Sequence, residues 1–221
     1  MTLVARYGPS LLSGFGVTVL CWAAGCVIGI GIGFILALLQ RPHIRPLTWL
    51  IRAYIEIFRG TPFLIQLFFL YSGGPFIGLR LEATTAGIVG LGIYGSAYFA
   101  EIFRGGFLAV PKGHVEAAVS LGMSHGAVLR LVILPEMLVA IVPGLINMMI
   151  ILTKETVVLS IITVPELMYQ MLTMAAETFA AFETILAMAV FYWILVEAVS
   201  RFGRRVEARL TRFMAHRPGA S

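Results

Sequence analysis

Long apolar stretches separated by short polar connections run through most of the chain. A helix that crosses the hydrocarbon core of a bilayer needs about 20 mainly apolar residues, with its backbone hydrogen bonds satisfied internally. Five segments meet this requirement, at about 10–39, 50–72, 83–103, 132–153 and 180–201. Pro62 interrupts the second, and Pro143 is expected to kink the fourth. The pattern predicts an all-α, polytopic membrane helix bundle of about five transmembrane helices.

The first apolar segment carries glycines at every fourth position, namely Gly25, Gly29 and Gly33. These glycines share one helix face and allow another helix to approach closely. Packing within the chain and contact with a second subunit both fit this face. The segment is also longer than the core of a cleavable signal peptide, about 7–15 residues, so we expect it to remain as a helix.

The composition indicates that a bilayer surrounds most of the chain. Hydrophobic residues make up 59% of the 221 positions, and 12% are charged, about half of the share in soluble domains. A water-soluble domain of this length could not hide so much apolar surface. We expect a single transmembrane domain over residues 1–221, with its core at about 10–205.

The basic residues, which give a net charge of +5, fall mostly on one side of the predicted bundle. With five spans, that side holds Arg41, Arg45, Arg52, Arg104, Lys112, Arg130, Arg201, Arg204, Arg205, Arg209, Arg212 and Arg217, and the other side holds Arg6, Arg80 and Lys154. This bias predicts an external N-terminus and a cytoplasmic C-terminus, with a basic tail at 202–221 near the lipid headgroups. Bases scattered between apolar runs favour membrane lipid over nucleic acid as the partner.

The longest predicted cytoplasmic connection, residues 104–130, contains two short helix-forming pieces. Gly122 can end the first piece in the left-handed conformation, and Ser124 can cap the second. The result is two helices joined by a sharp turn and displayed to the cytoplasm. Such a projection suits a groove on another protein, and it equally suits an amphipathic loop that lies on the membrane.

A spaced motif in this connection resembles the EAA loop of ATP-binding-cassette (ABC) importer permeases. Glu116-Ala117-Ala118 is followed after three residues by Gly122, and after nine more by Val132-Ile133-Leu134-Pro135. The family pattern is EAA-x3-G-x9-I-x-L-P, from which only Val132 departs. In that family the loop docks onto the ATP-hydrolysing subunit. The resemblance implies an ATPase-coupling surface of Glu116, Ala117, Ala118, Gly122, Leu134 and Pro135.

Three more segments resemble the polar amino-acid permease branch of type I importers, which includes histidine, glutamine and arginine permeases. They read YIEIFRGTPFLIQLFFLYSGGP, GSAYFAEIFRGG and KETVVLSIITVPEL. The resemblance implies the membrane subunit of an inner-membrane amino-acid importer that works by alternating access. It also implies an ABC ATPase dimer, a second copy or related permease, and an extracytoplasmic solute-binding protein as partners. The cargo stays open among basic, acidic and amide amino acids and their derivatives.

Several charged side chains lie at or near membrane depth, where they are costly unless paired or wet. Helical spacing allows ion pairs between Glu56 and Arg59, and between Glu101 and Arg104. Gly60 and Pro62 break the helix beside Arg59, and a broken helix in a membrane is tolerated where it lines a cavity. Arg59 suits the carboxylate of an amino acid and Glu155 suits its amino group. We therefore expect the substrate path to be bordered by Arg59, Thr61, Lys154 and Glu155.

The chain lacks the G-x-x-x-x-G-K-[ST] loop that cradles ATP, and it contains no aspartate to hold magnesium. ATP and Mg²⁺ are therefore expected on the partner subunit, with no cofactor on this chain. Its histidines and cysteines show no metal-ligand spacing, so no metal site is expected. An intramembrane enzyme would need a base beside Ser96 or Ser160, and no histidine lies in a predicted span. A passive channel is the remaining alternative.

Overall fold

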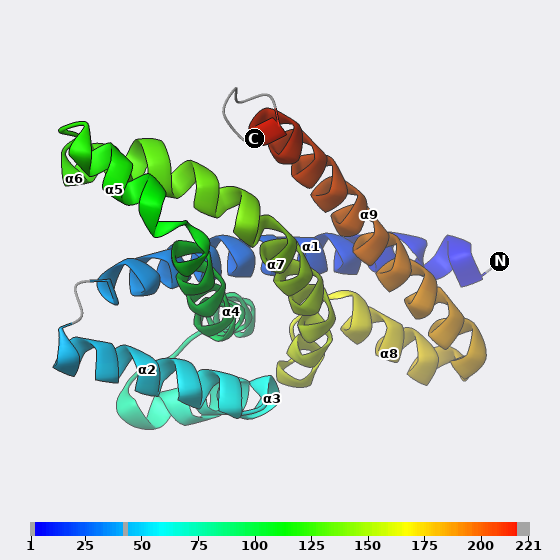
Figure 1. Cartoon of the computed structure of the whole chain (residues 1–221). Helices are drawn as coiled ribbons and strands as arrows, with labels where there is room; N and C mark the ends of the chain where they lie inside the picture. Colours follow the sequence, from blue (N-terminus) through cyan, green and yellow to red (C-terminus); the bar gives the residue numbers. More distant parts are fainter. Residues whose placement is uncertain (1–2, 42–43, 216–221) are drawn as a thin grey trace.

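The structure is a computed structural model that describes residues 3–41 and 44–215 (Figure 1). These residues form helices and connections, with no strand among them, so the all-α prediction is confirmed. The helices are α1 (Leu3–Leu39), α2 (Arg45–Gly60), α3 (Phe63–Phe68), η1 (Phe69–Gly73), η2 (Gly74–Ile77), α4 (Ala83–Ala109), α5 (Lys112–Ser120), α6 (His125–Val128), η3 (Leu129–Ile133), α7 (Leu134–Glu155), η4 (Thr156–Ile162), α8 (Leu167–Thr178) and α9 (Ala181–Ala215).

Four helical stretches in the described part are long and apolar enough to cross a membrane. They are Arg6–Leu39, Ala83–Ala109, His125–Ile162 and Ala181–Arg209. The predicted second span is not one straight helix, because Arg45–Gly60 and Phe63–Ile77 meet at an angle of 107°. Pro62 lacks an N–H and its ring excludes a continuous helix there. The count of five spans is confirmed only if this bent pair forms one of them.

Helix α4 lies at the centre of the bundle. Of its apolar window 67% is buried, against 28% or less in the other three long spans. The glycine face of α1 packs against it: a Cβ on Gly33 would lie 2.7 Å from Cβ of Phe99 and 2.8 Å from N of Ala100. A Cβ on Gly25 would lie 2.7 Å from Cβ of Leu91. The small-residue face therefore serves packing within the chain.

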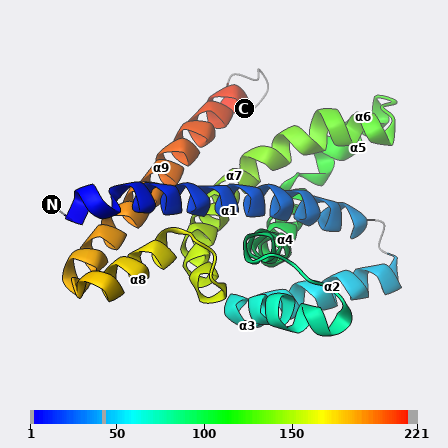
Figure 2. The same ribbon diagram turned by 180° about the vertical axis from the view of Figure 1, so that it is seen from behind.

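Helix α7 continues through Pro143 and changes direction along its length (Figures 1 and 2). It packs against both α4 and α9. The indole Nε1–H of Trp22 donates to the backbone carbonyl of Met149 at 2.9 Å, which ties α1 to α7. The central helices α1, α4 and α7 thus form one packed unit with a shared apolar core.

Helix α8 was not expected as a separate element, because its 12 residues are too short for a span. It lies beside the first half of α1 and the start of α9 (Figure 2). Leu167, Met171 and Met174 form a second apolar cluster there with Tyr7 of α1. Helix α9 then extends through much of the arginine-rich tail to Ala215, while residues 216–221, which include Arg217, lie outside the described residues.

A buried carboxylate, that of Glu166, connects α8 to α1 and α9. Glu166 has no exposed surface, and its Oε1 accepts a hydrogen bond from N–H of Tyr169 at 2.8 Å as the N-cap of α8. Its Oε2 accepts from the hydroxyl of Thr18 at 3.3 Å and from that of Tyr192 at 3.2 Å. Because each partner comes from a different helix, this one side chain connects α1, α8 and α9.

Candidate functional site

The cytoplasmic connection expected at 104–130 folds into a protruding helical loop at one end of the bundle (Figure 1). Helix α5 ends at Ser120, and Gly122 adopts a left-handed φ of +78°, as its glycine identity predicts. Oγ of Ser124 accepts from N–H of Ala127 at 3.3 Å and caps α6. Both local predictions, the glycine turn and the serine cap, are confirmed.

The second predicted helix of the loop is not separate, since α6 passes through η3 directly into α7. The π-helical turn η3 precedes Pro135, which has no N–H to donate. The N–H of Leu134 instead donates to the carbonyl of Leu129, five residues back. The chain absorbs the proline by widening one turn, so the loop and α7 form a single helical stretch.

The six residues of the expected coupling surface are not equally accessible. Glu116, Ala117 and Gly122 are exposed on the loop. Ala118 is buried at 5% exposure and joins the main core, while Leu134 and Pro135 are half-buried at the start of α7. Three of the six are thus open to a partner, whereas Ala118 packs into the core and Leu134 and Pro135 are partly covered.

A polar contact fastens the loop to the transmembrane part. Nδ1 of His114 on α5 lies 2.9 Å from Oε2 and 3.0 Å from Oε1 of Glu136 in the first turn of α7. His114 is 58% exposed, whereas Glu136 is 17% exposed. No local sequence pattern indicates this pair, because the two residues lie 22 positions apart on different helices.

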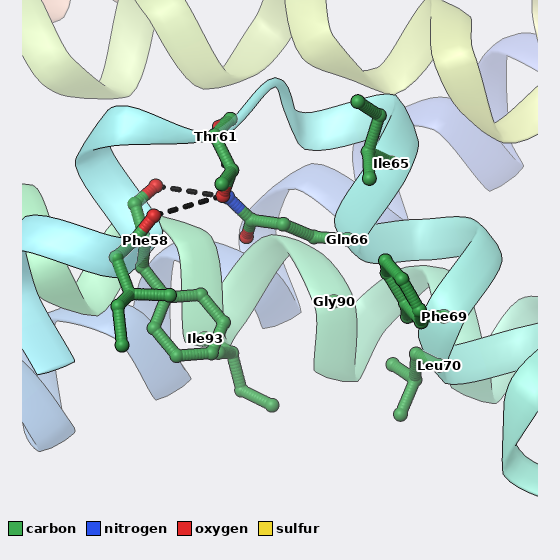
Figure 3. Close-up of a pocket in the computed structure, with 9 residues that line it drawn as sticks. Phe58, Thr61, Ile65, Gln66, Phe69, Leu70, Gly90 and Ile93 are labelled. Carbon is green, nitrogen blue, oxygen red and sulfur yellow. Dashed lines mark hydrogen bonds between the residues drawn. The ribbon is translucent and has the colours of Figure 1, made fainter.

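The broken second span is held by hydrogen bonds to the carbonyls that the break exposes. Nε2 of Gln66 donates to O of Phe58 at 2.8 Å, to O of Thr61 at 3.0 Å and lies 2.8 Å from Oγ1 of Thr61 (Figure 3). The hydroxyl of Thr61 donates to O of Ile57 at 2.8 Å. Gln66 was not among the predicted residues; a lone amide shortly after a helix-breaking proline is the signal that could have identified it.

A mainly apolar cavity of about 390 Å³ opens at this break. Its lining includes Thr61 and Gln66 from the two sides of the break and Gly90 and Ile93 from α4 (Figure 3). Of the four predicted substrate-path residues, Thr61 lines this cavity, whereas Arg59, Lys154 and Glu155 do not. The hydroxyl of Thr61 is already engaged in the bend, so its structural task is to shape the cavity wall.

Arg59 turns toward α4 rather than toward its own helix. Its guanidinium lies over the ring of Tyr98, 5.3 Å from the centroid, and 4.0 Å from Oε2 of Glu101. The pair expected between Glu56 and Arg59 is therefore wrong, because Arg59 finds both an aromatic face and a carboxylate on the neighbouring helix. The pair between Glu101 and Arg104 is confirmed, with two contacts of 2.9 and 2.7 Å.

Two tyrosines of α4 interact with Arg59 and Glu155, Tyr98 with the first and Tyr94 with the second. The ring of Tyr94 packs on that of Tyr98 with centroids 5.1 Å apart, and the Tyr94 hydroxyl donates to that of Tyr98 at 3.3 Å. Glu155, half-buried at the end of α7, is near enough to Tyr94 for an electrostatic interaction. The side chains of Glu155 and of the exposed Lys154 have no hydrogen bond or ion pair within residues 3–41 and 44–215. A basic group thus contacts one tyrosine of the pair, and an acidic group interacts electrostatically with the other.

The sequence profile of the family described as "binding-protein-dependent transport system inner membrane component" matches residues 29–212. The chain belongs to this family. As an inner membrane component of a binding-protein-dependent system, it is a multi-pass membrane subunit that works with a binding protein and an ATPase. Its resemblance to amino-acid ABC permeases, stated from the motifs, is confirmed by the relatives that it matches.

Three curated relatives cover nearly the whole chain of this inner membrane component. The arginine transport system permease protein ArtQ of Bacillus subtilis is 32% identical over 203 residues, which is 91% of this chain and 93% of ArtQ. The probable glutamine ABC transporter permease protein GlnM of the same organism is 34% identical and covers 87% and 88%. The L-cystine permease protein TcyB, also from B. subtilis, is 32% identical and covers 95% and 90%.

Solved structures share the fold of this inner membrane component. An amino acid ABC transporter crystallised with histidines matches with a TM-score of 0.86 at 35% identity, covering 93% of this chain and 96% of that one. The MetNI methionine ABC transporter matches with a TM-score of 0.69 at 24% identity, covering 94% and 96%. The expected importer permease fold is therefore confirmed.

Proposed function

We propose that this permease imports polar amino acids or their derivatives through an ATP-driven cycle of alternating access. Three relatives named for arginine, glutamine and cystine support this cargo class. The observation that carries the proposal is a protruding loop with exposed Glu116 and Ala117 at one end of a membrane bundle. A surface of that kind suits a groove in a soluble motor protein.

The coupling step is assigned to α5 and the glycine turn. An ABC ATPase dimer, carrying ATP and Mg²⁺, receives Glu116, Ala117 and Gly122 in a groove, and its closure displaces the loop. Ala118, Leu134 and Pro135 then pass the displacement into the bundle, since they lie on the inner side of the loop. Nucleotide binding thereby shifts the balance between inward-open and outward-open states. A second copy or a related permease completes the pathway, and an external solute-binding protein delivers the cargo.

The cargo site is assigned to the tyrosine pair with which Arg59 and Glu155 interact. A free amino acid carries a carboxylate and an ammonium group, so a basic and an acidic side chain beside an aromatic pair match its two ends. Arg59 keeps N–H donors for the carboxylate, since its contact with Glu101 is long, at 4.0 Å. Glu155 receives the ammonium, Thr61 shapes the wall, and the exposed Lys154 borders the entrance.

Uptake by variants of these charges tests the cargo site. Arg59→Gln and Glu155→Gln, made one at a time in the chain co-expressed with its ATPase, should each reduce uptake at least about tenfold by removing one charge-assisted contact. Glu183→Gln is the matched control, because that carboxylate is exposed and distant in sequence from both groups. Unchanged uptake in both variants at normal expression would remove this assignment.

The orientation is proposed from the positive-inside rule, with the N-terminus outside and the C-terminus in the cytoplasm. It places Arg41, Lys112 and Arg130 with the protruding loop on the basic side. Single cysteines introduced at Ala117 and at Phe182, both exposed, test it in intact cells of a variant without Cys21 and Cys26. A membrane-impermeant thiol reagent should label position 182 and leave position 117 unlabelled until the cells are opened. The reverse pattern would overturn the orientation.

A liposome assay separates this importer from a passive channel. The complete complex should move radiolabelled arginine, glutamine or cystine only when ATP, the ATPase and the binding protein are all present. Flux that persists when ATP is withheld contradicts the ATP-driven cycle and favours the channel.

A further inference from the structure

A second cavity, of about 460 Å³, lies between the end of α1, the first half of α2 and the end of α4. Its lining includes three arginines, Arg41 just after α1, Arg52 on α2 and Arg104 on α4, together with Gln40 and Thr48. In both views the end of α1 and the start of α2 lie on the same side of the bundle as α5 and α6 (Figures 1 and 2). The cavity therefore belongs to the end of the molecule that carries the protruding loop.

Two arginines of this cavity, Arg52 and Arg104, interact electrostatically with the same carboxylate, that of Glu101. Arg104 is held by Glu101 through two short contacts, and the same carboxylate is also approached by Arg59. The side chain of Arg52 is exposed and makes no direct ion pair or hydrogen bond in the part of the chain that the structure describes, so it acts on Glu101 only at longer range. Several guanidinium groups thus share one carboxylate, which favours an anion in the cavity.

Two residues that line the cavity each carry a buried polar atom without a hydrogen-bond partner among the described residues. These atoms are Nε2 of Gln40, whose side chain belongs to a residue only 8% exposed, and Oγ1 of Thr48. Native proteins leave few buried polar atoms without a partner, and an unfilled one often marks the place of a bound group. An occupant with several oxygen acceptors fits a wall that combines guanidinium, amide and hydroxyl donors.

The remaining wall is apolar and opens toward the surface. Phe107 lines the cavity, where the guanidinium of Arg41 lies 4.9 Å from its ring centroid, and the neighbouring Leu108 is 73% exposed. A small hydrated anion gains nothing from contact with this apolar surface. A phospholipid can place its phosphate against the arginines and its acyl chains against the apolar side. Basic pockets between transmembrane helices on the cytoplasmic side suit anionic headgroups.

We propose that the cavity between α1, α2 and α4 binds the phosphate group of an anionic phospholipid from the inner leaflet, with Arg52 as its principal contact. This inference rests on the orientation proposed above and is independent of the cargo. A lipid bound between these helices would hold α2, the first half of the bent pair, at a fixed distance from the end of α4 that leads into the loop.

Lipid binding to the purified full chain in mild detergent tests the proposal by native mass spectrometry. Phosphatidylglycerol should be retained in preference to phosphatidylcholine, and Arg52→Gln should weaken its binding about fivefold, the effect expected for one arginine near a headgroup. Arg130→Gln, which removes an exposed base outside the cavity, should leave binding unchanged. Because Arg52 is exposed and unpaired in the described residues, its replacement should not disturb folding.

Inorganic phosphate separates the two sources of a phosphate group. If the site takes a lipid, excess phosphate should not displace phosphatidylglycerol, because it cannot replace the chain contacts. Displacement by phosphate alone, equal retention of the two lipids, or wild-type binding by Arg52→Gln would each overturn the proposal. Since no transport is measured, the result stands apart from the uptake test, and the thiol-labelling test decides the orientation separately.

Discussion

The hydroxyl of Thr18 lies 3.3 Å from Oε2 of Glu166, although the two residues are 148 positions apart in the sequence. Both residues are fully buried. Tyr192 reaches the same oxygen at 3.2 Å, and the other carboxylate oxygen caps α8. The short helix α8 is therefore anchored to α1 and α9 by a polar group inside the fold.

Replacing Glu166 with alanine should destabilise the protein by on the order of 2 kcal/mol, because a buried N-cap and two hydroxyl partners lose their acceptor together. Thermal unfolding in detergent measures this loss. Glu183→Ala is the control, since Glu183 is exposed at the start of α9. Equal unfolding temperatures for the two variants would mean that the buried network does not hold α8.

Alanine replacements at two glycines of α1, Gly33 and Gly31, test the packing of α1 on α4 separately from the effect of glycine on helix stability. Gly33→Ala should destabilise the fold by about 1–3 kcal/mol, because the added Cβ would stand 2.7 Å from Cβ of Phe99 and 2.9 Å from the carbonyl of Ser96. Gly31→Ala meets nothing within 4 Å and should stabilise the helix by about 0.5–1 kcal/mol. Unfolding curves of both variants check the opposite signs, and a harmless Gly33→Ala would contradict the close approach of α1 to α4.

The contact between His114 and Glu136 should govern how efficiently ATP hydrolysis drives import. His114→Ala and Glu136→Ala should each lower the amount of amino acid imported per ATP severalfold while hydrolysis continues, because α5 loses its side-chain link to α7. The double variant should be no worse than either single one, since the same contact is removed. Lys112→Ala, on the same helix and exposed, serves as the reference. Additive losses would show that the residues act separately.

Charge reversal on the exposed face of α5 should prevent assembly without harming the fold. Glu116→Arg should abolish co-purification of the ATPase, because an exposed side chain on a protruding helix contributes to docking and little to stability. Glu183→Arg makes the same change in charge on α9 and should co-purify normally. Retention of the ATPase by the Glu116 variant would argue that the docking surface lies elsewhere.

The spans and the loop turn could be predicted because their causes are local. Segment length and hydropathy identify a helix that crosses the membrane, and the φ of +78° at Gly122 follows from the residue that best tolerates it. Pro62 predicts a break in the helix at this point. No local sequence pattern predicts the 107° angle or the hydrogen bonds by which Gln66 holds the bend.

Contacts between distant residues were beyond the reach of such patterns. Helical spacing offered Glu56 as the partner of Arg59, whereas the folded chain brings Glu101 and Tyr98 to it from α4. The acceptor role of Glu166 likewise depends on Thr18 and Tyr192, which no periodicity connects. The sequence supplies the candidate charges, and only the packing of helices decides which of them meet.

The uninterrupted passage from α6 through η3 into α7 has a mechanical consequence. From His125 to Glu155 the helix extends for about 30 residues, or about 45 Å along its path. No loop interrupts this stretch, although α7 changes direction along its length. If the ATPase docks on the loop as proposed, a small tilt there would be passed along the helix to Glu155 at its opposite end. The wider turn before Pro135 keeps the helical hydrogen bonding continuous between the loop and α7.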